Sequence, residues 1–96
     1  MTEKILLKLS KIIKNRKQTP RTGSYTSKLF KKGKVKIANK VGEEAVETIS
    51  AFLSEGKKEI LEESADLIFH LFVLLEYSNL SIKDVCKILD ERIKDD

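Results

Sequence analysis

Two amphipathic segments separated by a glycine decide the fold: VKIANKVGEEAVETISAFLS at residues 35–54 and KEILEESADLIFHLFVLLEY at residues 58–77. In each segment the apolar residues recur at intervals of three and four, which is the spacing of one face of an α-helix. Neither segment alternates polar and apolar residues with the period of two that a half-buried strand requires. Because Gly56 and its flanks supply a short turn, the pattern predicts two long antiparallel helices.

The flanking sequence predicts further helices separated by short turns, and the C-terminal half of the second long segment is apolar nearly all round, as in a helix buried in a bundle. The further expected elements are a helix over residues 3–15 capped by Thr2, a proline-containing loop over residues 16–23, a short helix capped by Ser24 that runs to Lys32 and stops at Gly33, and a last helix that follows a break near Asn79 and is capped by Ser81. The predicted fold class is therefore all-α: a single domain over residues 1–96, built as a small antiparallel bundle of four to five helices. Because amphipathic helices in so small a chain leave apolar surface uncovered, we expect a homodimer or a higher homo-oligomer.

Composition excludes several classes of protein. The longest apolar run, residues 67–75, is far shorter than the ~20 residues that span a bilayer, and it is interrupted by His70. The N-terminus lacks the apolar block and cleavage site of a secretory signal. The only cysteine, Cys86, excludes an intrachain disulfide, and we expect it in the core, on the apolar stripe of the last helix. These observations favour a cytoplasmic protein without membrane contact.

Charge is divided unevenly along the chain. Residues 1–42 hold 13 Lys or Arg and one acid, whereas residues 43–96 hold 6 Lys or Arg and 14 acids. A basic half followed by an acidic half is typical of a nucleic-acid-binding arm with an acidic tail. A nucleotide enzyme, with lysines for phosphates and carboxylates for a metal, has the same distribution, so the placement of the acids has to distinguish the two.

Two pairs of acids lie at helical spacing. Glu44 and Glu47 are neighbours on the first long helix, and Glu63 and Asp66 are neighbours on the second. If these helices are antiparallel, the four carboxylates can meet at one site. Like charges next to apolar residues are costly to bury, and the cost is offset either by lysines or by a hard divalent cation. Oxygen ligands favour Mg²⁺ or Mn²⁺ over zinc, although the spacing alone leaves a salt-bridged or solvated face equally open.

The stretches SYTSKLFKKGKVKIANKVGEEAVETISAF (residues 24–52) and EESADLIFHLFVLL (residues 62–75) resemble the phosphoribosyl-ATP pyrophosphohydrolase family, which belongs to the all-α MazG-like NTP pyrophosphohydrolase superfamily. The combined motifs S-Y-T, K-V-G-E-E-A-x-E and A-D-L-x-x-H carry the resemblance, which covers nearly the whole chain. It implies Mg²⁺-dependent hydrolysis of phosphoribosyl-ATP to phosphoribosyl-AMP and pyrophosphate, the second step of histidine biosynthesis, with Mn²⁺ as a possible substitute. Since the chain lacks the Cys and His residues of the zinc cyclohydrolase to which many relatives are fused, the stand-alone form is implied.

The resemblance also implies roles for individual residues. The implied metal ligands are Glu44, Glu47, Glu63 and Asp66, because each occupies its motif position. Glu43 and Glu47 are the candidate catalytic carboxylates, one of which would accept a proton from the attacking water. The candidate phosphate-binding residues are Lys28, Lys32, Lys40 and Ser24. Plainer readings are a surface position for these lysines and for Glu59 and Glu62, a helix cap for Ser24, and a satisfied core histidine for His70.

Two other functions compete with this one. A house-cleaning pyrophosphohydrolase acting on other nucleoside triphosphates would use the same metal and a different base pocket. A nucleic-acid-binding helical module would use the basic half and bind in a strongly salt-dependent way. The basic half offers only Tyr25 and Phe30 as aromatic rings for base stacking, which makes nucleic acid the less favoured partner. A small-molecule nucleotide substrate is the expected ligand.

Overall fold

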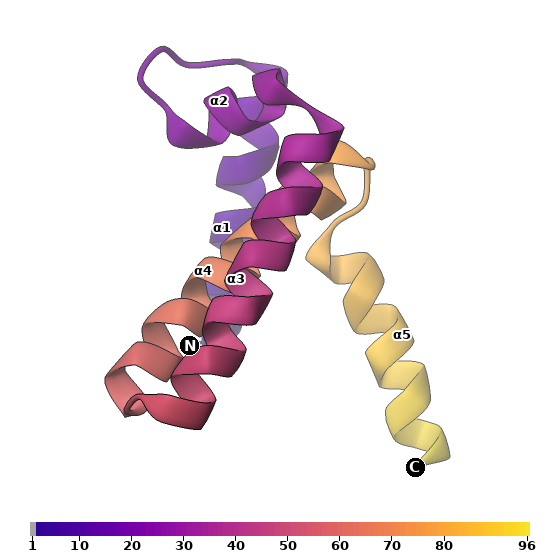
Figure 1. Cartoon of the computed structure of the whole chain (residues 1–96). Coiled ribbons are helices and arrows are strands. Elements are labelled where there is room, and N and C mark those ends of the chain that lie inside the picture. Colours follow the sequence, from indigo (N-terminus) through magenta and orange to yellow (C-terminus); the bar gives the residue numbers. More distant parts are fainter. Residues whose placement is uncertain (1) are drawn as a thin grey trace.

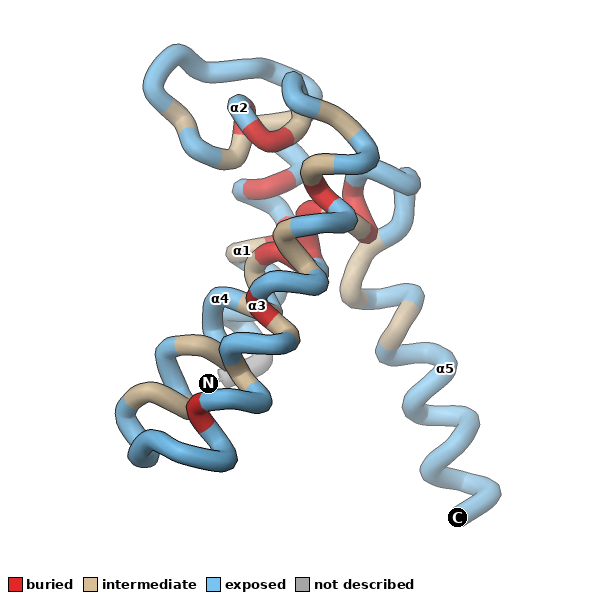
Figure 2. The backbone as a smooth tube through the Cα atoms, viewed as in Figure 1, coloured by how far each residue is buried: buried red, intermediate tan, exposed pale blue. Residues whose placement is uncertain are grey.

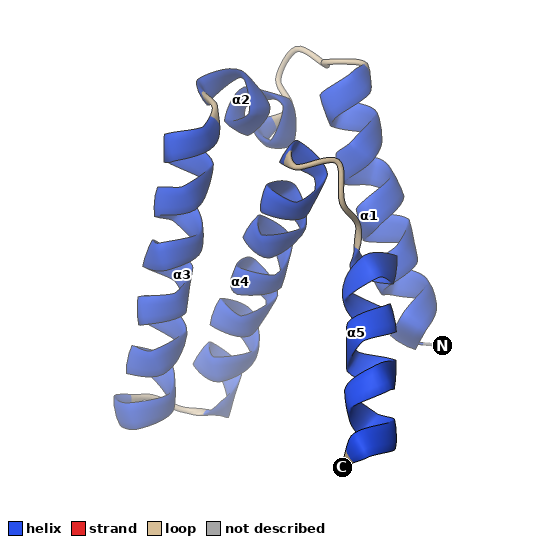
Figure 3. Ribbon diagram, turned by 90° about the vertical axis from the view of Figure 1, so that its right-hand side faces the viewer, coloured by secondary structure: helices blue, strands red, loops and turns tan. Residues whose placement is uncertain are grey.

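The computed structural model describes residues 2–96, with side chains from Lys4 onward, as helices joined by short loops (Figure 1). Their bounds are α1 (Thr2–Gln18), α2 (Tyr25–Lys32), α3 (Lys34–Ser54), α4 (Lys57–Tyr77) and α5 (Ile82–Asp95). No strand occurs among residues 2–96 (Figure 3), so the all-α prediction is confirmed. The main difference is that α1 continues three residues beyond the predicted Asn15. The predicted Thr2 cap lies outside the described side chains.

The two long segments form the predicted antiparallel hairpin of α3 and α4 (Figure 3). At the turn, the backbone N–H of Gly56 donates to Glu59 Oε1 at 3.1 Å, which satisfies a polar group at the start of α4. Near the middle, Thr48 Oγ1 on α3 lies 2.7 Å from the backbone oxygen of Glu44 and 3.2 Å from that of Glu63 on α4. One hydroxyl therefore contacts both helices at the level of two of the predicted metal ligands.

The short helix α2 crosses the end of this hairpin and has the predicted caps. Ser24 Oγ accepts a hydrogen bond from the backbone N–H of Ser27 at 3.1 Å, so Ser24 is an N-cap. Gly33 ends α2 with a φ of +93°, a conformation that glycine adopts without steric cost. At the other end of α4, Asn79 has a φ of +60°, as expected for the break before α5.

The core lies at the end of the molecule where α1, α2, the start of α3 and the end of α4 meet (Figure 2). Its buried apolar residues are Ile13, Leu29, Ile37, Phe72, Val73 and Leu75. This arrangement confirms that most of the C-terminal half of α4 is buried, although Ile68 and Leu71 remain more than one-third exposed. Further along the hairpin, the one fully buried apolar residue described is the small Ala51 on α3, while Ile60 and Leu67 on α4 are half-buried.

The predicted apolar face of α3 exists, but no other helix described for this chain covers it. Phe52 is 71% exposed, and the neighbouring apolar side chains on α3 and α4 are similarly accessible: Val46, Ile49, Leu53 and Leu61. α3 turns a different face toward α4, the one that carries Glu44, Thr48 and Ala51. We name the exposed set, Val46, Ile49, Phe52, Leu53 and Leu61, the hairpin apolar face.

The last helix departs from the expected bundle. α5 packs against the core through Ile82 and Val85 and then extends away from the other helices (Figure 1). Our prediction that Cys86 is a core residue is wrong, because Cys86 is exposed, as is every residue that follows it. The apolar stripe of α5 is real, but beyond Val85 its residues Ile88, Leu89 and Ile93 are exposed. Over residues 2–96 no single helix meets the length and hydropathy needed to cross a membrane, and α4 and α5 do so only as a pair bent by 105°.

Candidate metal and substrate site

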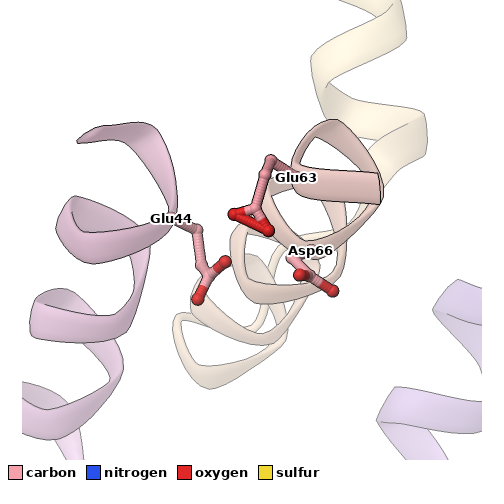
Figure 4. Close-up of side chains that lie close together, drawn as sticks. All are labelled: Glu44, Glu63 and Asp66. Carbon is pink, nitrogen blue, oxygen red and sulfur yellow. The ribbon is translucent and has the colours of Figure 1, made fainter. Parts of the chain in front are cut away.

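Three of the predicted metal ligands converge between α3 and α4. Glu44 on α3 and Glu63 and Asp66 on α4 each place one carboxylate oxygen within 4.8 Å of the other two (Figure 4). We name these three residues the carboxylate cluster. Glu44 is only 6% exposed, Glu63 is half-buried and Asp66 is exposed. The cluster therefore runs from the interior to the surface, and a cation from solvent can reach it on the Asp66 side.

Glu44 has an unsatisfied oxygen. Its Oε2 is buried and has no hydrogen-bond partner among the described residues, while its Oε1 lies 3.8 Å from Lys40 Nζ. Burial, followed by the negative charges of Glu47 and Asp66, raises the pKa of Glu44 above its usual value. A buried carboxylate with one unpaired oxygen is costly unless a cation or donor binds it. The donor set is entirely oxygen, so these residues fit a hard divalent cation.

The fourth predicted ligand, Glu47, lies beside this cluster rather than within it. Hydrogen bonding with the Glu47 side chain, partial burial and the charges of Glu47, Asp66 and Glu44 raise the pKa of Glu63 to about 7. The same Glu47 side chain interacts with Glu44. The four carboxylates predicted from spacing are thus neighbours in space, and a divalent cation bound there would compete with the proton that Glu63 holds.

Glu43 and Lys40 form a separate contact at the edge of the cluster. Lys40 Nζ lies 3.1 Å from Glu43 Oε2, and hydrogen bonding to Glu43 raises the pKa of Lys40. The Glu43 side chain is 55% exposed and is not one of the three converging carboxylates. The lysine predicted to bind phosphate is therefore directed at two acids, and it offsets part of the cluster's negative charge.

Sequence reasoning missed a pair of residues that links α2 to the cluster. The Tyr25 hydroxyl lies 3.0 Å from His70 Nε2, and His70 Nδ1 lies 2.8 Å from the backbone oxygen of Asp66. A carbonyl only accepts, so Nδ1–H donates to Asp66 and Nε2 accepts the hydroxyl proton of Tyr25. His70 is buried and hydrogen-bonded at both nitrogens, as expected of a satisfied core histidine. Both residues stand in recognisable motifs, but their contact spans 45 positions in the chain.

The remaining phosphate candidates lie on α2 or at its start and are not among the residues that contact the carboxylates. The Ser24 hydroxyl is engaged as the cap of α2. Lys28 lines a pocket beside α2, together with Ser24 and Tyr25, whereas Lys32 is exposed at the end of α2 and is not part of that pocket. The structure thus separates the four residues: Lys40 is at the cluster, Lys28 and Ser24 are at the pocket, and Lys32 is at neither.

Comparison with known proteins identifies the family of this chain. Residues 6–93 match the family model described as phosphoribosyl-ATP pyrophosphohydrolase. Proteins named phosphoribosyl-ATP pyrophosphatase are similar along nearly the whole chain: that of Pyrobaculum arsenaticum is 45% identical and that of Pyrobaculum aerophilum 48% identical, each over 98% of this chain and 100% of the relative. The histidine biosynthesis bifunctional protein HisIE of Pyrococcus furiosus is 51% identical over 94% of this chain and 42% of its own length. With full-length similarity and a matching family model, this chain belongs to the phosphoribosyl-ATP pyrophosphohydrolase family.

Proposed function

We propose that this protein hydrolyses phosphoribosyl-ATP to phosphoribosyl-AMP and pyrophosphate, a step of histidine biosynthesis. Membership of the family and the names of its relatives support the substrate and the reaction. Within the structure, the observation that carries the proposal is the carboxylate cluster, in which Glu44, Glu63 and Asp66 place oxygens within 4.8 Å of one another across two helices. If these acids formed only a solvated helix face, Glu44 would not be buried with an unpaired carboxylate oxygen.

The proposed cofactor is Mg²⁺, with Mn²⁺ as the alternative. Glu44, Glu63 and Asp66 would hold it, with Glu47 beside them. When bound, such an ion neutralises phosphate charge and lowers the pKa of a coordinated water molecule. The buried free oxygen of Glu44 and the all-oxygen donor set support this assignment.

The chain's own residues supply the proton chemistry. Hydrolysis forms a bond from a water oxygen to the α-phosphorus. It breaks the bond from that phosphorus to the oxygen that bridges the α- and β-phosphates, and the bridging oxygen leaves with pyrophosphate. The attacking water must lose a proton, and we assign a carboxylate oxygen of Glu47 as its acceptor, since Glu47 adjoins both Glu44 and Glu63. Glu43 holds Lys40 at 3.1 Å and so acts as a positioning residue for this cation.

Pyrophosphate release from phosphoribosyl-ATP, measured beside ATP, dUTP and dCTP with Mg²⁺ or with EDTA, tests the proposal. We expect Mg²⁺-dependent release from phosphoribosyl-ATP in preference to the other three. Glu47→Gln should lower kcat by ~10²- to 10⁴-fold, the usual contribution of a general base. Glu62→Gln, an exposed neighbour on α4, is the matched control and should keep wild-type activity.

Two results would refute this function. Equal release from all four nucleotides would indicate a house-cleaning pyrophosphohydrolase. No release from any of them, together with binding to nucleic acid that weakens steeply with salt, would indicate a binding module.

We further propose that two copies pair through the hairpin apolar face. In one chain this face leaves Phe52, Leu53 and Leu61 more than two-thirds exposed, and contiguous apolar surface of this kind marks an interaction site. A cytoplasmic location accompanies the proposal and is supported by the single cysteine and the absence of a disulfide partner.

A further inference from the structure

A second candidate site lies beside α2. A pocket of about 1010 Å³ is formed by the loop between α1 and α2, α2 itself and the end of α4. Among the described residues its lining contains no carboxylate, and its cationic and aromatic side chains include Arg21, Lys28, Lys31, Tyr25, Phe30 and Tyr77. We name it the basic pocket.

The positive charge of the basic pocket is not neutralised within the described part of the chain. Over residues 4–96, Arg21, Lys28 and Lys31 form no ion pair with a carboxylate. The fourth cation of the lining, Lys17, is engaged, because it donates to the backbone oxygen of Glu76 and to Asn79 Oδ1. Cations gathered on a concave surface without acids create a positive potential that attracts an anionic group.

The loop that carries Arg21 is held in place by hydrogen bonds. The backbone N–H of Arg21 donates to Ser27 Oγ at 3.0 Å, and Ser27 Oγ donates in turn to the backbone oxygen of Arg16 at 3.2 Å. The backbone N–H of Ser24 donates to the backbone oxygen of Arg21 at 3.0 Å. Since Ser27 is buried, the two bonds made by its hydroxyl are partly shielded from water. Together the three bonds pre-organise the loop, which lowers the entropic cost of binding a ligand there.

Tyr25 connects the basic pocket to the carboxylate cluster. Its ring lines the pocket and is half-exposed, and its hydroxyl donates to His70, which donates to the backbone oxygen of Asp66. Two hydrogen bonds therefore separate the wall of the pocket from a member of the cluster.

We propose that the basic pocket binds the phosphorylated ribose that the substrate carries in addition to its triphosphate, with Arg21 and Lys28 contacting that phosphate. The planar guanidinium of Arg21 can pair two oxygens of a phosphate at once, and Lys28 supplies a point charge. This assignment rests on the proposed function. It adds the residues that would distinguish phosphoribosyl-ATP from an ordinary nucleoside triphosphate, which has the triphosphate but lacks the additional phosphorylated ribose.

Steady-state kinetics of charge-neutralised variants test the assignment. Arg21→Gln and Lys28→Gln should each raise KM for phosphoribosyl-ATP by ~10- to 100-fold, the range for a lost hydrogen bond to a charged group, and should leave kcat within about twofold. Lys34→Gln removes the same charge from an exposed position outside the pocket and should leave KM unchanged. Matching thermal unfolding curves for the three variants would establish that all of them fold.

Ribose 5-phosphate serves as a probe in a second measurement without Mg²⁺. Calorimetry should detect its binding to the wild-type protein and to Lys34→Gln, and at least tenfold weaker binding to Arg21→Gln. It should also inhibit hydrolysis competitively with phosphoribosyl-ATP. Non-competitive inhibition would instead indicate a separate effector site and would overturn the assignment.

Other outcomes also contradict it. An unchanged KM in both Arg21→Gln and Lys28→Gln, or an equal rise in Lys34→Gln, would show that these cations act only through net charge or not at all. Failure of the proposed function has a different signature, because the wild-type protein would then release no pyrophosphate from phosphoribosyl-ATP.

Discussion

Glu44 is the most buried side chain of the carboxylate cluster. Its buried Oε2 has no partner among the described residues, and burial, followed by the charges of the neighbouring acids Glu47 and Asp66, raises the pKa of its carboxyl group. Without a bound cation, the negative charge of the buried Glu44 carboxylate opposes folding. With a bound cation, the same carboxylate is a metal ligand. The same residue thus links stability to metal binding, because a cation that binds only the folded protein stabilises it.

Glu44→Gln separates these two effects. We expect it to raise the unfolding free energy of the metal-free protein by about 1 kcal/mol, which corresponds to a Tm increase of ~4–8 °C for a domain of this size. The added stabilisation by Mg²⁺ should fall to near zero, because a ligand oxygen is lost. Thermal unfolding with EDTA and with Mg²⁺ measures both quantities. A metal-free Glu44→Gln protein less stable than wild type would contradict this account.

The titration of Glu63 predicts a pH dependence of stability. Its pKa of about 7 in the folded protein lies above the ordinary value of 4.5, so the folded protein holds this proton more tightly than the unfolded chain does. The unfolding free energy of the metal-free protein should therefore decrease as pH rises from about 4.5 to about 7. Stabilisation by Mg²⁺ should increase over the same interval, since cation and proton compete for the same oxygens.

Unfolding curves between pH 5 and pH 8, with EDTA and with Mg²⁺, check this prediction. In Glu63→Gln the decrease attributable to this group should disappear. A metal-free protein whose stability rises across this interval would show that the carboxylates do not repel one another as we infer.

At the scale of the helices, Thr48 links α3 to α4 at the level of the cluster. Its hydroxyl lies 2.7 Å from the backbone oxygen of Glu44 and 3.2 Å from that of Glu63. Thr48→Val keeps the shape and removes the donor. We expect a loss of about 1 kcal/mol of unfolding free energy and a Mg²⁺ affinity lowered by ~3- to 10-fold, measured by denaturant unfolding and calorimetry.

Thr48→Ser is the control for this variant, because it keeps the hydroxyl and should retain most of the stability and most of the Mg²⁺ affinity. An unchanged Mg²⁺ affinity in Thr48→Val would show that Thr48 is not part of the site.

Helices were predicted well because their signals are local. The capping serine at Ser24, the glycine at Gly33 and the left-handed Asn79 each ended or began a helix where the sequence indicated. The fate of Cys86 was not predictable in the same way, because an apolar stripe shows which side of α5 is apolar and not whether another helix covers it.

At the scale of the whole molecule, the hairpin apolar face predicts a dimer of 11.0 kDa chains. Phe52→Glu should convert that dimer to a monomer in light scattering and lower its Tm by several degrees, since it places a charge where apolar surface would be buried. Ser54→Glu adds the same charge on the opposite side of α3 by helical phase and should leave the dimer intact. A wild-type protein that is monomeric at micromolar concentration would refute the interface.

The sequence by itself determined the helices, the turns between them and the family. It also determined that Glu44 and Glu47 share a face of one helix and that Glu63 and Asp66 share a face of the next, because such neighbours follow from spacing within one segment. Only the tertiary structure decided which faces meet. It turned Glu44 and Thr48 of α3 toward α4, brought Tyr25 to His70, and built the basic pocket from three separate segments. The physical reason is that helical phase is a local property, whereas contacts between distant residues depend on how side chains of all the helices pack together.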